Sequence, residues 1–172
     1  MSRPLPRKPV PPLDLPLIDG GRFVLADSKP QAFTMLVFYR GLHCPLCQTY
    51  LAELQDRLDQ FSQLGIEAVA ISMDSEKRAR IAQEDWGLPQ LRIAYGLSED
   101  DARAYGLYLT DAVFKAEPRR FSEPGLFLVR PDTTLYFASF QTMPFGRSSF
   151  EEIISVVGKM VELDYPARGE AA

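Results

Sequence analysis

The chain has 172 residues, of which 46% are hydrophobic and 24% charged, as expected for one globular domain. Its 19 basic and 23 acidic residues give a net charge of -4, which argues against nucleic acid as a partner. No apolar run approaches the roughly 20 residues of a membrane span, and the first residues lack the apolar stretch of a signal peptide. We therefore expect a soluble, cytoplasmic protein with no membrane partner.

The rarest residues are clustered. The one histidine, His43, and the two cysteines, Cys44 and Cys47, lie within five positions. A structural zinc site needs about four such ligands, so no metal is expected. Two cysteines also cannot form the disulfide framework of a small secreted protein. In an intracellular chain, a Cys-x-x-Cys pair points first to redox chemistry.

The N-terminus is rich in proline, with six of the 14 prolines in residues 1–16. Proline removes backbone donors, so residues 1–12 are predicted to form an extended arm. A single domain follows over residues 13–165, and residues 166–172 form a tail. At the start of the domain, Asp-Gly-Gly at residues 19–21 separates two alternating apolar segments, which predicts a β-hairpin.

The rest of the domain alternates between apolar runs typical of buried strands and segments with helical spacing. Strands are predicted at residues 33–39, 66–73, 125–129 and 133–140. Helices are predicted at residues 45–65, 75–86 and 98–105, with a last one starting at Ser148 or Ser149. The first helix carries an apolar stripe of Leu51, Leu54, Leu58 and Phe61, and the last one a stripe of Phe150, Ile154, Val157 and Val161. This order predicts an α/β fold with parallel and antiparallel strands in one sheet.

Cys44 lies between a strand-loop and Pro45, a residue type favoured in the first turn of a helix. We therefore predict that Cys44 is the N-cap of the helix and that Cys47 lies one turn inside it. A thiolate there is stabilised by free backbone N–H groups and by the helix dipole, which lower cysteine pKa values to roughly 3.5–7.5. This position favours a reactive Cys44 over the alternative that both cysteines only fill the core.

Other residues near the pair have two interpretations each. Arg40 is a cation for the thiolate or a bound oxygen substrate, or else a solvated loop residue. His43 adjoins Cys44, but neighbours at a helix start usually point apart, which disfavours a protease-like Cys–His pair. Trp86 is expected to pack rather than to contact substrate. Pro124 precedes a strand and is either an ordinary turn proline or a cis-proline that brings backbone close to the thiols.

Residues 38–47 (FYRGLHCPLC) resemble the active-site segment of peroxiredoxin-like proteins of the alkyl hydroperoxide reductase/thiol-specific antioxidant (AhpC/TSA) family. Residues 70–74 with 86–89 are similar to the second strand and helix of that family, and residues 102–107 to the segment ahead of its final hairpin. The resemblance covers about residues 13–161. It implies a thioredoxin-like fold, with a mixed central sheet flanked by helices and an N-terminal β-hairpin. Residues 124–129 resemble the strand that follows a cis-proline in that fold, which favours a cis Pro124.

By this resemblance, Cys44 attacks the O–O bond of a hydroperoxide and becomes a sulfenic acid. Cys47 then forms an intramolecular disulfide with it, and a thioredoxin-type or low-molecular-weight thiol reduces the disulfide. No cofactor is implied, and a homodimer is compatible with the family. The expected catalytic residues are Cys44, Cys47 and Arg40, and the expected substrate contacts are Tyr39, Gly41, His43 and Pro124.

The chain departs from the family pattern at two places. The family has Pro and Thr or Ser seven and three residues before the peroxidatic cysteine, where this chain has Val37 and Gly41. The hydroxyl that positions the peroxide is therefore missing. The family's arginine near the penultimate strand has no clear counterpart; the candidates are Arg119, Arg120 and Arg130, with Arg40 as a local substitute.

These observations favour a thiol-dependent oxidoreductase that reduces peroxides. The first alternative is a thioredoxin-like thiol–disulfide oxidoreductase acting on protein disulfides, with Cys44 attacking, Cys47 resolving and Pro124 seating the substrate backbone. The second is a binding or redox-sensing module without turnover. Peroxide consumption and insulin-disulfide reduction distinguish the three.

Overall fold

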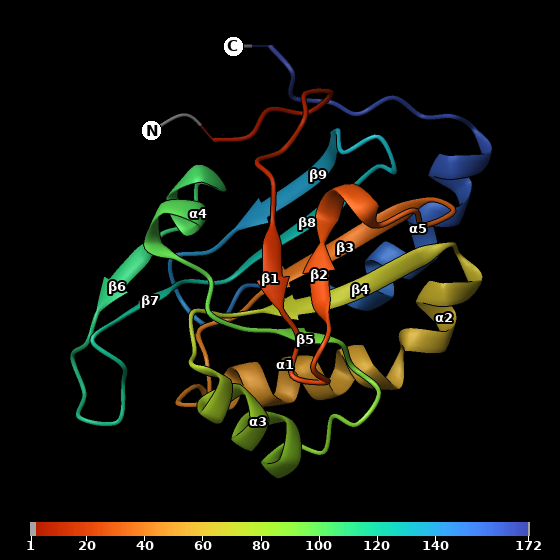
Figure 1. Cartoon of the computed structure of the whole chain (residues 1–172). Helices are drawn as coiled ribbons and strands as arrows, with labels where there is room; N and C mark the ends of the chain where they lie inside the picture. Colours follow the sequence, from red (N-terminus) through yellow and green to blue (C-terminus); the bar gives the residue numbers. More distant parts are fainter. Residues whose placement is uncertain (1–2, 172) are drawn as a thin grey trace.

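The computed structural model describes residues 3–171 and is built around one five-stranded sheet (Figure 1). The spatial order of its strands is β5 (Ile93–Ala94), β4 (Ile66–Ile71), β3 (Phe33–Phe38), β8 (Gly125–Val129) and β9 (Leu135–Phe140). The central strand β3 runs parallel to β4 and antiparallel to β8, so the sheet is mixed, as predicted. Two small antiparallel pairs lie outside it: β1 (Asp14–Pro16) with β2 (Arg22–Val24), and β6 (Leu109–Asp111) with β7 (Arg120–Ser122).

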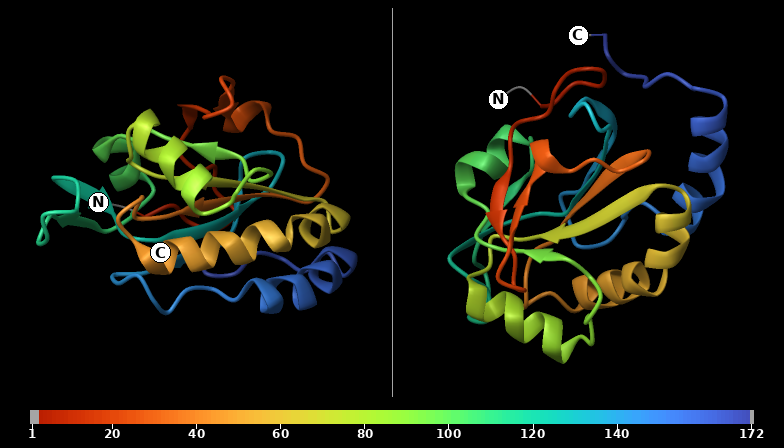
Figure 2. Two further views of the ribbon diagram at one scale, coloured as in Figure 1. Left: turned by 90° about the horizontal axis from the view of Figure 1, so that it is seen from below. Right: turned by 45° about the vertical axis from the view of Figure 1, so that its right-hand side comes forward.

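Five α-helices and one short 3-10 helix, Leu25–Asp27, complete the described part of the chain. The α-helices are α1 (Pro45–Asp56), α2 (Leu58–Gln63), α3 (Glu76–Asp85), α4 (Glu99–Ala104) and α5 (Phe150–Glu162). Helices α1 and α5 lie together on one side of the sheet (Figure 2, left). The sheet thus has one face for long helices and another for the β1–β2 hairpin and α4.

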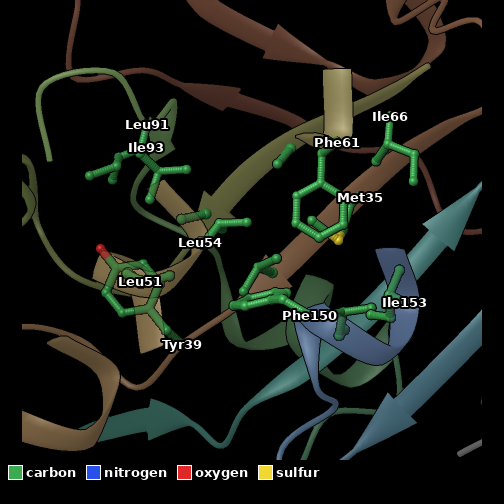
Figure 3. Packing of buried hydrophobic residues seen from close by; sticks show 14 of the residues in the cluster. Met35, Tyr39, Leu51, Leu54, Phe61, Ile66, Leu91, Ile93, Phe150 and Ile153 are labelled. Carbon is green, nitrogen blue, oxygen red and sulfur yellow. The ribbon is translucent and has the colours of Figure 1, made fainter. Parts of the chain in front are cut away.

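Successive side chains of β3 point to opposite faces of the sheet, which explains this division. Met35 and Val37 point into a core shared with α1, α2 and α5, part of which is drawn in Figure 3. Leu36 and Phe38 point into a second core, shared with the β1–β2 hairpin and α4. All four side chains are buried, because a central strand is covered on both faces.

The structure differs from the prediction in two of the helices. Residues 45–65 form two helices, because Arg57 leaves the helical conformation with φ -108° and ψ 3°. In α5 the buried residues are Phe150, Ile153 and Val157, whereas Val161 is exposed. The predicted stripe was therefore wrong at two positions: Ile153 is buried in place of Ile154, which is only half-buried, and Val161 in the last turn is exposed.

The proline-rich arm lies along the edge strand β9. The Arg7 amide donates to the Leu135 carbonyl at 2.9 Å, and the Val10 amide to the Thr133 carbonyl at 3.0 Å. Arg7 also donates from Nε to the Ala167 carbonyl at 2.9 Å, which ties the arm to the C-terminal tail. Within residues 3–171, no helix has the length and apolar character needed to cross a membrane.

Candidate active site

Cys44 is the N-cap residue of α1, as predicted from Pro45. Its backbone is extended, with φ -106° and ψ 102°, and its Sγ accepts a hydrogen bond from the Cys47 amide at 3.2 Å. The Cys44 amide itself donates to the Gly41 carbonyl at 3.0 Å, which closes a turn just before the helix. The Cys44 sulfur is thus held at the helix N-terminus, where backbone N–H groups favour a negative charge.

Asp74, just after β4, fixes the loop that carries Cys44. Its Oδ2 accepts a hydrogen bond from the Leu42 amide at 2.7 Å, and its Oδ1 one from Arg78 Nε at 2.7 Å. Gly41 has φ +123°, and a Cβ added there would lie 2.7 Å from the Asp74 carboxylate. A side chain at this position would therefore require the Asp74 carboxylate or the loop backbone to shift.

Arg147, which the sequence analysis missed, contacts both thiols. It lies two residues before the N-cap of α5, and its Nη2 is 3.0 Å from Cys47 Sγ and 4.0 Å from Cys44 Sγ. Its Nε donates to the Pro144 carbonyl at 2.8 Å, and its guanidinium lies over the Tyr50 ring at 4.8 Å. Within residues 3–171, its buried Nη1 has no hydrogen-bond partner. One buried donor of this guanidinium is therefore unpaired among the described residues.

The two thiols differ sharply in acidity. The hydrogen bond from the Cys47 side chain, assisted by the Cys47 amide and Arg147, lowers the pKa of Cys44 to about 6 despite burial. Burial, together with the hydrogen bond to Cys44, raises the pKa of Cys47 well above its ordinary value. Both cysteines are free and buried. At neutral pH the arrangement is a thiolate on Cys44 and a thiol on Cys47.

Arg40 lies close to the site, but carboxylates engage it. It is 3.6 Å from Glu117 Oε1 through Nη2 and 3.3 Å from Glu123 Oε2 through Nε. Its guanidinium also lies over the Phe121 ring at 4.7 Å. Arg40 still helps to lower the pKa of Cys44, after Arg147. Its main contacts nevertheless connect the loop before α1 to the segment that carries β7.

The neighbouring candidates Tyr39 and His43 pack on aromatic rings. Tyr39 is fully buried, with its ring 6.1 Å from the Trp86 ring, and burial raises the pKa of its hydroxyl. Trp86 thus packs against the core. The His43 ring lies 4.5 Å from Phe121, and burial, followed by Arg40, lowers its pKa, so the imidazole is neutral at pH 7. Direct substrate contact by Tyr39 and His43 stays a prediction.

The expectation of a cis-proline was wrong, because no peptide bond within residues 3–171 is cis, including the one before Pro124. Pro124 is buried and precedes Gly125, which pairs with Phe38. Its carbonyl accepts from the Gln141 amide at 3.0 Å. Pro124 thus lies in the sheet beside the end of β3, and a role in seating substrate stays a prediction.

The other arginines considered in place of the family's arginine have different surroundings. Arg120 pairs with Glu99 at 2.8 Å and with Asp111 at 2.7 Å. Arg130 lies over the Tyr136 ring at 4.8 Å. Arg119 is exposed and makes no side-chain hydrogen bond or ion pair within residues 3–171. The guanidinium that contacts the thiols belongs to Arg147.

Known proteins share this fold and part of this sequence. Residues 6–138 match the family described as AhpC/TSA. The chain is 26% identical over 137 residues to the mitochondrial thioredoxin-dependent peroxide reductase of Homo sapiens, covering 76% of this chain and 50% of that protein. It is 24% identical over 152 residues to peroxiredoxin 2 of Sulfuracidifex metallicus, covering 86% and 63%. The chain thus spans less than two thirds of the length of these relatives.

Solved structures support the fold. The crystal structure of peroxidoxin BcpB from Mycobacterium tuberculosis superposes with a TM-score of 0.73 at 15% sequence identity, covering 93% of this chain and 99% of that one. At this identity the likeness concerns the fold alone. It confirms the predicted α/β, thioredoxin-like architecture with its mixed central sheet.

Proposed function

Because the chain belongs to the AhpC/TSA family, we propose that it is a thiol-dependent peroxidase that reduces hydrogen peroxide or organic hydroperoxides through Cys44 and Cys47. The observation that carries this proposal is the unequal acidity of the two thiols. The pKa of Cys44 is lowered to about 6, whereas that of Cys47 is raised. The Cys44 sulfur is therefore a nucleophilic thiolate at neutral pH, whereas the Cys47 sulfur remains a protonated thiol.

In the first step the Cys44 thiolate attacks one oxygen of the peroxide. A sulfur–oxygen bond forms, the O–O bond breaks, and the other oxygen leaves as water or alcohol after taking up a proton. The Arg147 guanidinium, 4.0 Å from Cys44 Sγ and with a free Nη1, is suited to hold the peroxide and to stabilise charge on the leaving oxygen. Arg147 thus takes the role that the sequence had suggested for Arg40.

In the second step the Cys47 thiol attacks the sulfur of the Cys44 sulfenic acid. A disulfide forms, and the sulfenic oxygen leaves as water with the Cys47 proton. Arg147 Nη2, 3.0 Å from Cys47 Sγ, favours the developing thiolate. An external dithiol then reduces the disulfide, which restores both thiols.

Burial favours a small oxidant over a protein disulfide. Cys44 is only 1% exposed, so a peroxide reaches it more readily than a folded partner does. One observation favours the alternative, thiol–disulfide exchange. Leu46, between the two cysteines, is 47% exposed and offers an apolar contact beside the thiols. Thiol–disulfide exchange is therefore the second candidate function.

The proposal also concerns the reductant, the oligomeric state and the cellular location. The name of the human relative supports a thioredoxin-type reductant, with a low-molecular-weight thiol as the alternative. A homodimer, a cytoplasmic location and the division into arm, domain and tail remain predictions from the sequence.

Two assays on the reduced full chain separate the candidates. A peroxidase consumes hydrogen peroxide or cumene hydroperoxide continuously with thioredoxin, thioredoxin reductase and NADPH, and reduces insulin disulfides poorly. Cys44→Ser abolishes consumption, whereas Cys47→Ser still consumes one equivalent of peroxide and then stops. Insulin reduction without peroxide turnover would instead establish thiol–disulfide exchange. Inactivity in both assays would contradict both enzyme proposals and favour a binding or sensing module.

A further inference from the structure

An apolar groove runs along the edge strand β9, away from the thiols. Its volume is about 660 Å³, and it lies between β9, α5 and the two chain ends, which Figure 1 shows on the same side of the molecule. Residues from three regions form its walls: Leu5 of the arm, Phe137 and Phe140 of β9, and Ile153, Val156 and Met160 of α5. This size is in the range of small-molecule sites.

The walls expose large apolar side chains that the fold leaves uncovered. Phe137 is 38% exposed, and Val156, on the facing helix, is 40% exposed. Within residues 3–171, the arm pairs with β9 only at the first residue of the strand, where the Leu135 amide donates to the Lys8 carbonyl at 2.9 Å. Residues 3–6 of the arm line the groove. An apolar ligand there would cover surface that now faces water.

Two cations border the groove on the side of the chain ends. Arg3 lies over the Phe140 ring at 4.6 Å and donates a hydrogen bond from Nη2 to the Tyr108 hydroxyl, whereas Arg168 lies over the Tyr165 ring at 5.8 Å. Neither guanidinium has a carboxylate partner within residues 3–171, in contrast to Arg7, which pairs with Glu170 at 3.3 Å. The acidic residue that lines the groove, Glu152, belongs to α5 on the opposite wall. Among residues 3–171, Arg168 is therefore a cation at the border of the groove with no ion pair.

We propose that this groove binds an amphiphilic carboxylate, with its acyl chain between β9 and α5 and its carboxylate at Arg168. The apolar walls supply affinity for the chain, and a guanidinium is the side chain best suited to a carboxylate. The site is separate from the thiols, because neither cysteine lines the groove. The inference therefore does not depend on the proposed peroxidase activity.

The first test measures binding of sodium dodecanoate, below its micellar concentration, to the reduced full chain by isothermal titration calorimetry. We expect one equivalent to bind and Val156→Glu to raise the dissociation constant at least about tenfold. Val161→Glu is the matched control, because Val161 is an exposed valine of the same helix that does not line the groove. Circular dichroism checks that both variants stay folded. Equal weakening by both variants would overturn the proposed location.

The second test addresses the charged end. Arg168→Glu is expected to weaken dodecanoate binding several-fold, whereas Lys77→Glu, the same charge change on exposed residue 77 of α3, leaves it unchanged. Dodecyltrimethylammonium, with the same chain and a cationic head, should bind far more weakly. Equal binding of the two amphiphiles would overturn the proposal. A dimer in solution that Val156→Glu dissociates would also overturn it, because a second copy would then cover the groove.

Discussion

Arg147 and Arg40 approach the same pair of cysteines from two different regions and have opposite surroundings. Arg147, in the loop before α5, is 3.0 Å from Cys47 Sγ and 4.0 Å from Cys44 Sγ, and it makes no ion pair with a carboxylate within residues 3–171. Arg40, in the loop before α1, has two carboxylates within 3.6 Å, those of Glu117 and Glu123. One positive charge therefore faces two negative ones on the Arg40 side.

The difference shows that the neighbours of a cation decide its role more than its position in the sequence. Arg40 lies four residues from Cys44, yet it comes after Arg147 among the causes that lower the pKa of Cys44. Its ion pairs give it a structural task, since they connect the loop before α1 to the segment around β7. Arg147 keeps a buried donor that has no hydrogen-bond partner within residues 3–171. The predictions below test this division of roles.

The largest effect is expected from Arg147→Met, which keeps the bulk of the side chain but removes its charge and donors. The second-order rate constant for hydrogen peroxide at pH 7 should fall roughly a hundredfold, as for the loss of a key oxyanion donor. Stopped-flow kinetics on the reduced protein measures it. A fall of less than about threefold would show that Arg147 does not act in the reaction.

Gly41→Ala tests the loop on the Arg40 side. The added Cβ would meet the Asp74 carboxylate at 2.7 Å in a backbone with φ +123°, so we expect a loss of about 3 kcal/mol in unfolding free energy. Gly20→Ala is the control, since Gly20 also has positive φ, at +94°, but nothing within 4 Å of its Cβ position. It should lose about 1 kcal/mol. Urea denaturation measures both, and equal losses would contradict the steric account.

Cys47→Ala tests the largest cause of the acidity of Cys44, the hydrogen bond from the Cys47 side chain. In the native protein, alkylation of Cys44 should rise with pH through about 6 and then level off, because the thiolate is the reacting form. Without the hydrogen bond the midpoint should move up toward the ordinary value of about 8.5. Alkylation at pH 7 should then slow about tenfold. An unchanged midpoint would assign the acidity to other groups.

The smallest effect is expected on the Arg40 side when both charges are removed together. A single change of Arg40 would leave Glu123 buried without a cation, so the informative variant combines Arg40→Met with Glu123→Gln. The amide introduced by the second change keeps an oxygen for the hydrogen bond from Thr110, which is 2.6 Å long in the native protein. We expect the peroxide rate constant to change less than about threefold. A loss as large as that of Arg147→Met would make Arg40 a catalytic residue.

Most of the fold was predictable because its signals are local. The apolar runs of β3, β4 and β8 and the caps Ser75, Ser98 and Ser149 can be read within a few residues. The pairs β5 with β4 and β6 with β7 were not predicted. Their strands β5, β6 and β7 are two or three residues long, and their pairing depends on distant partners. The break at Arg57 was also missed, because the apolar spacing continues across it.

In the candidate site, too, the local features were predictable and the long-range contacts were not. The N-cap position of Cys44 follows from Pro45, its immediate neighbour, and so does the placement of Cys47 one turn later. Arg147 is 100 residues from Cys47 and has no local sign of its role. Its one clue is that it precedes the cap of α5, and only the packing of α5 beside α1 brings it to the thiols. For the same reason the neutralisation of Arg40 by Glu117 and Glu123 was not foreseeable.

The most direct test of the account is the mass of the tryptic peptide 41–57 after one equivalent of hydrogen peroxide is added to the reduced protein. This peptide contains both cysteines. The account predicts a rapid loss of two hydrogens in the native protein, and in Cys47→Ser a gain of one oxygen that maps to Cys44. An unchanged peptide, or oxygen added first to Cys47 in Cys44→Ser at the native rate, would contradict the assignment of Cys44 as the attacking sulfur.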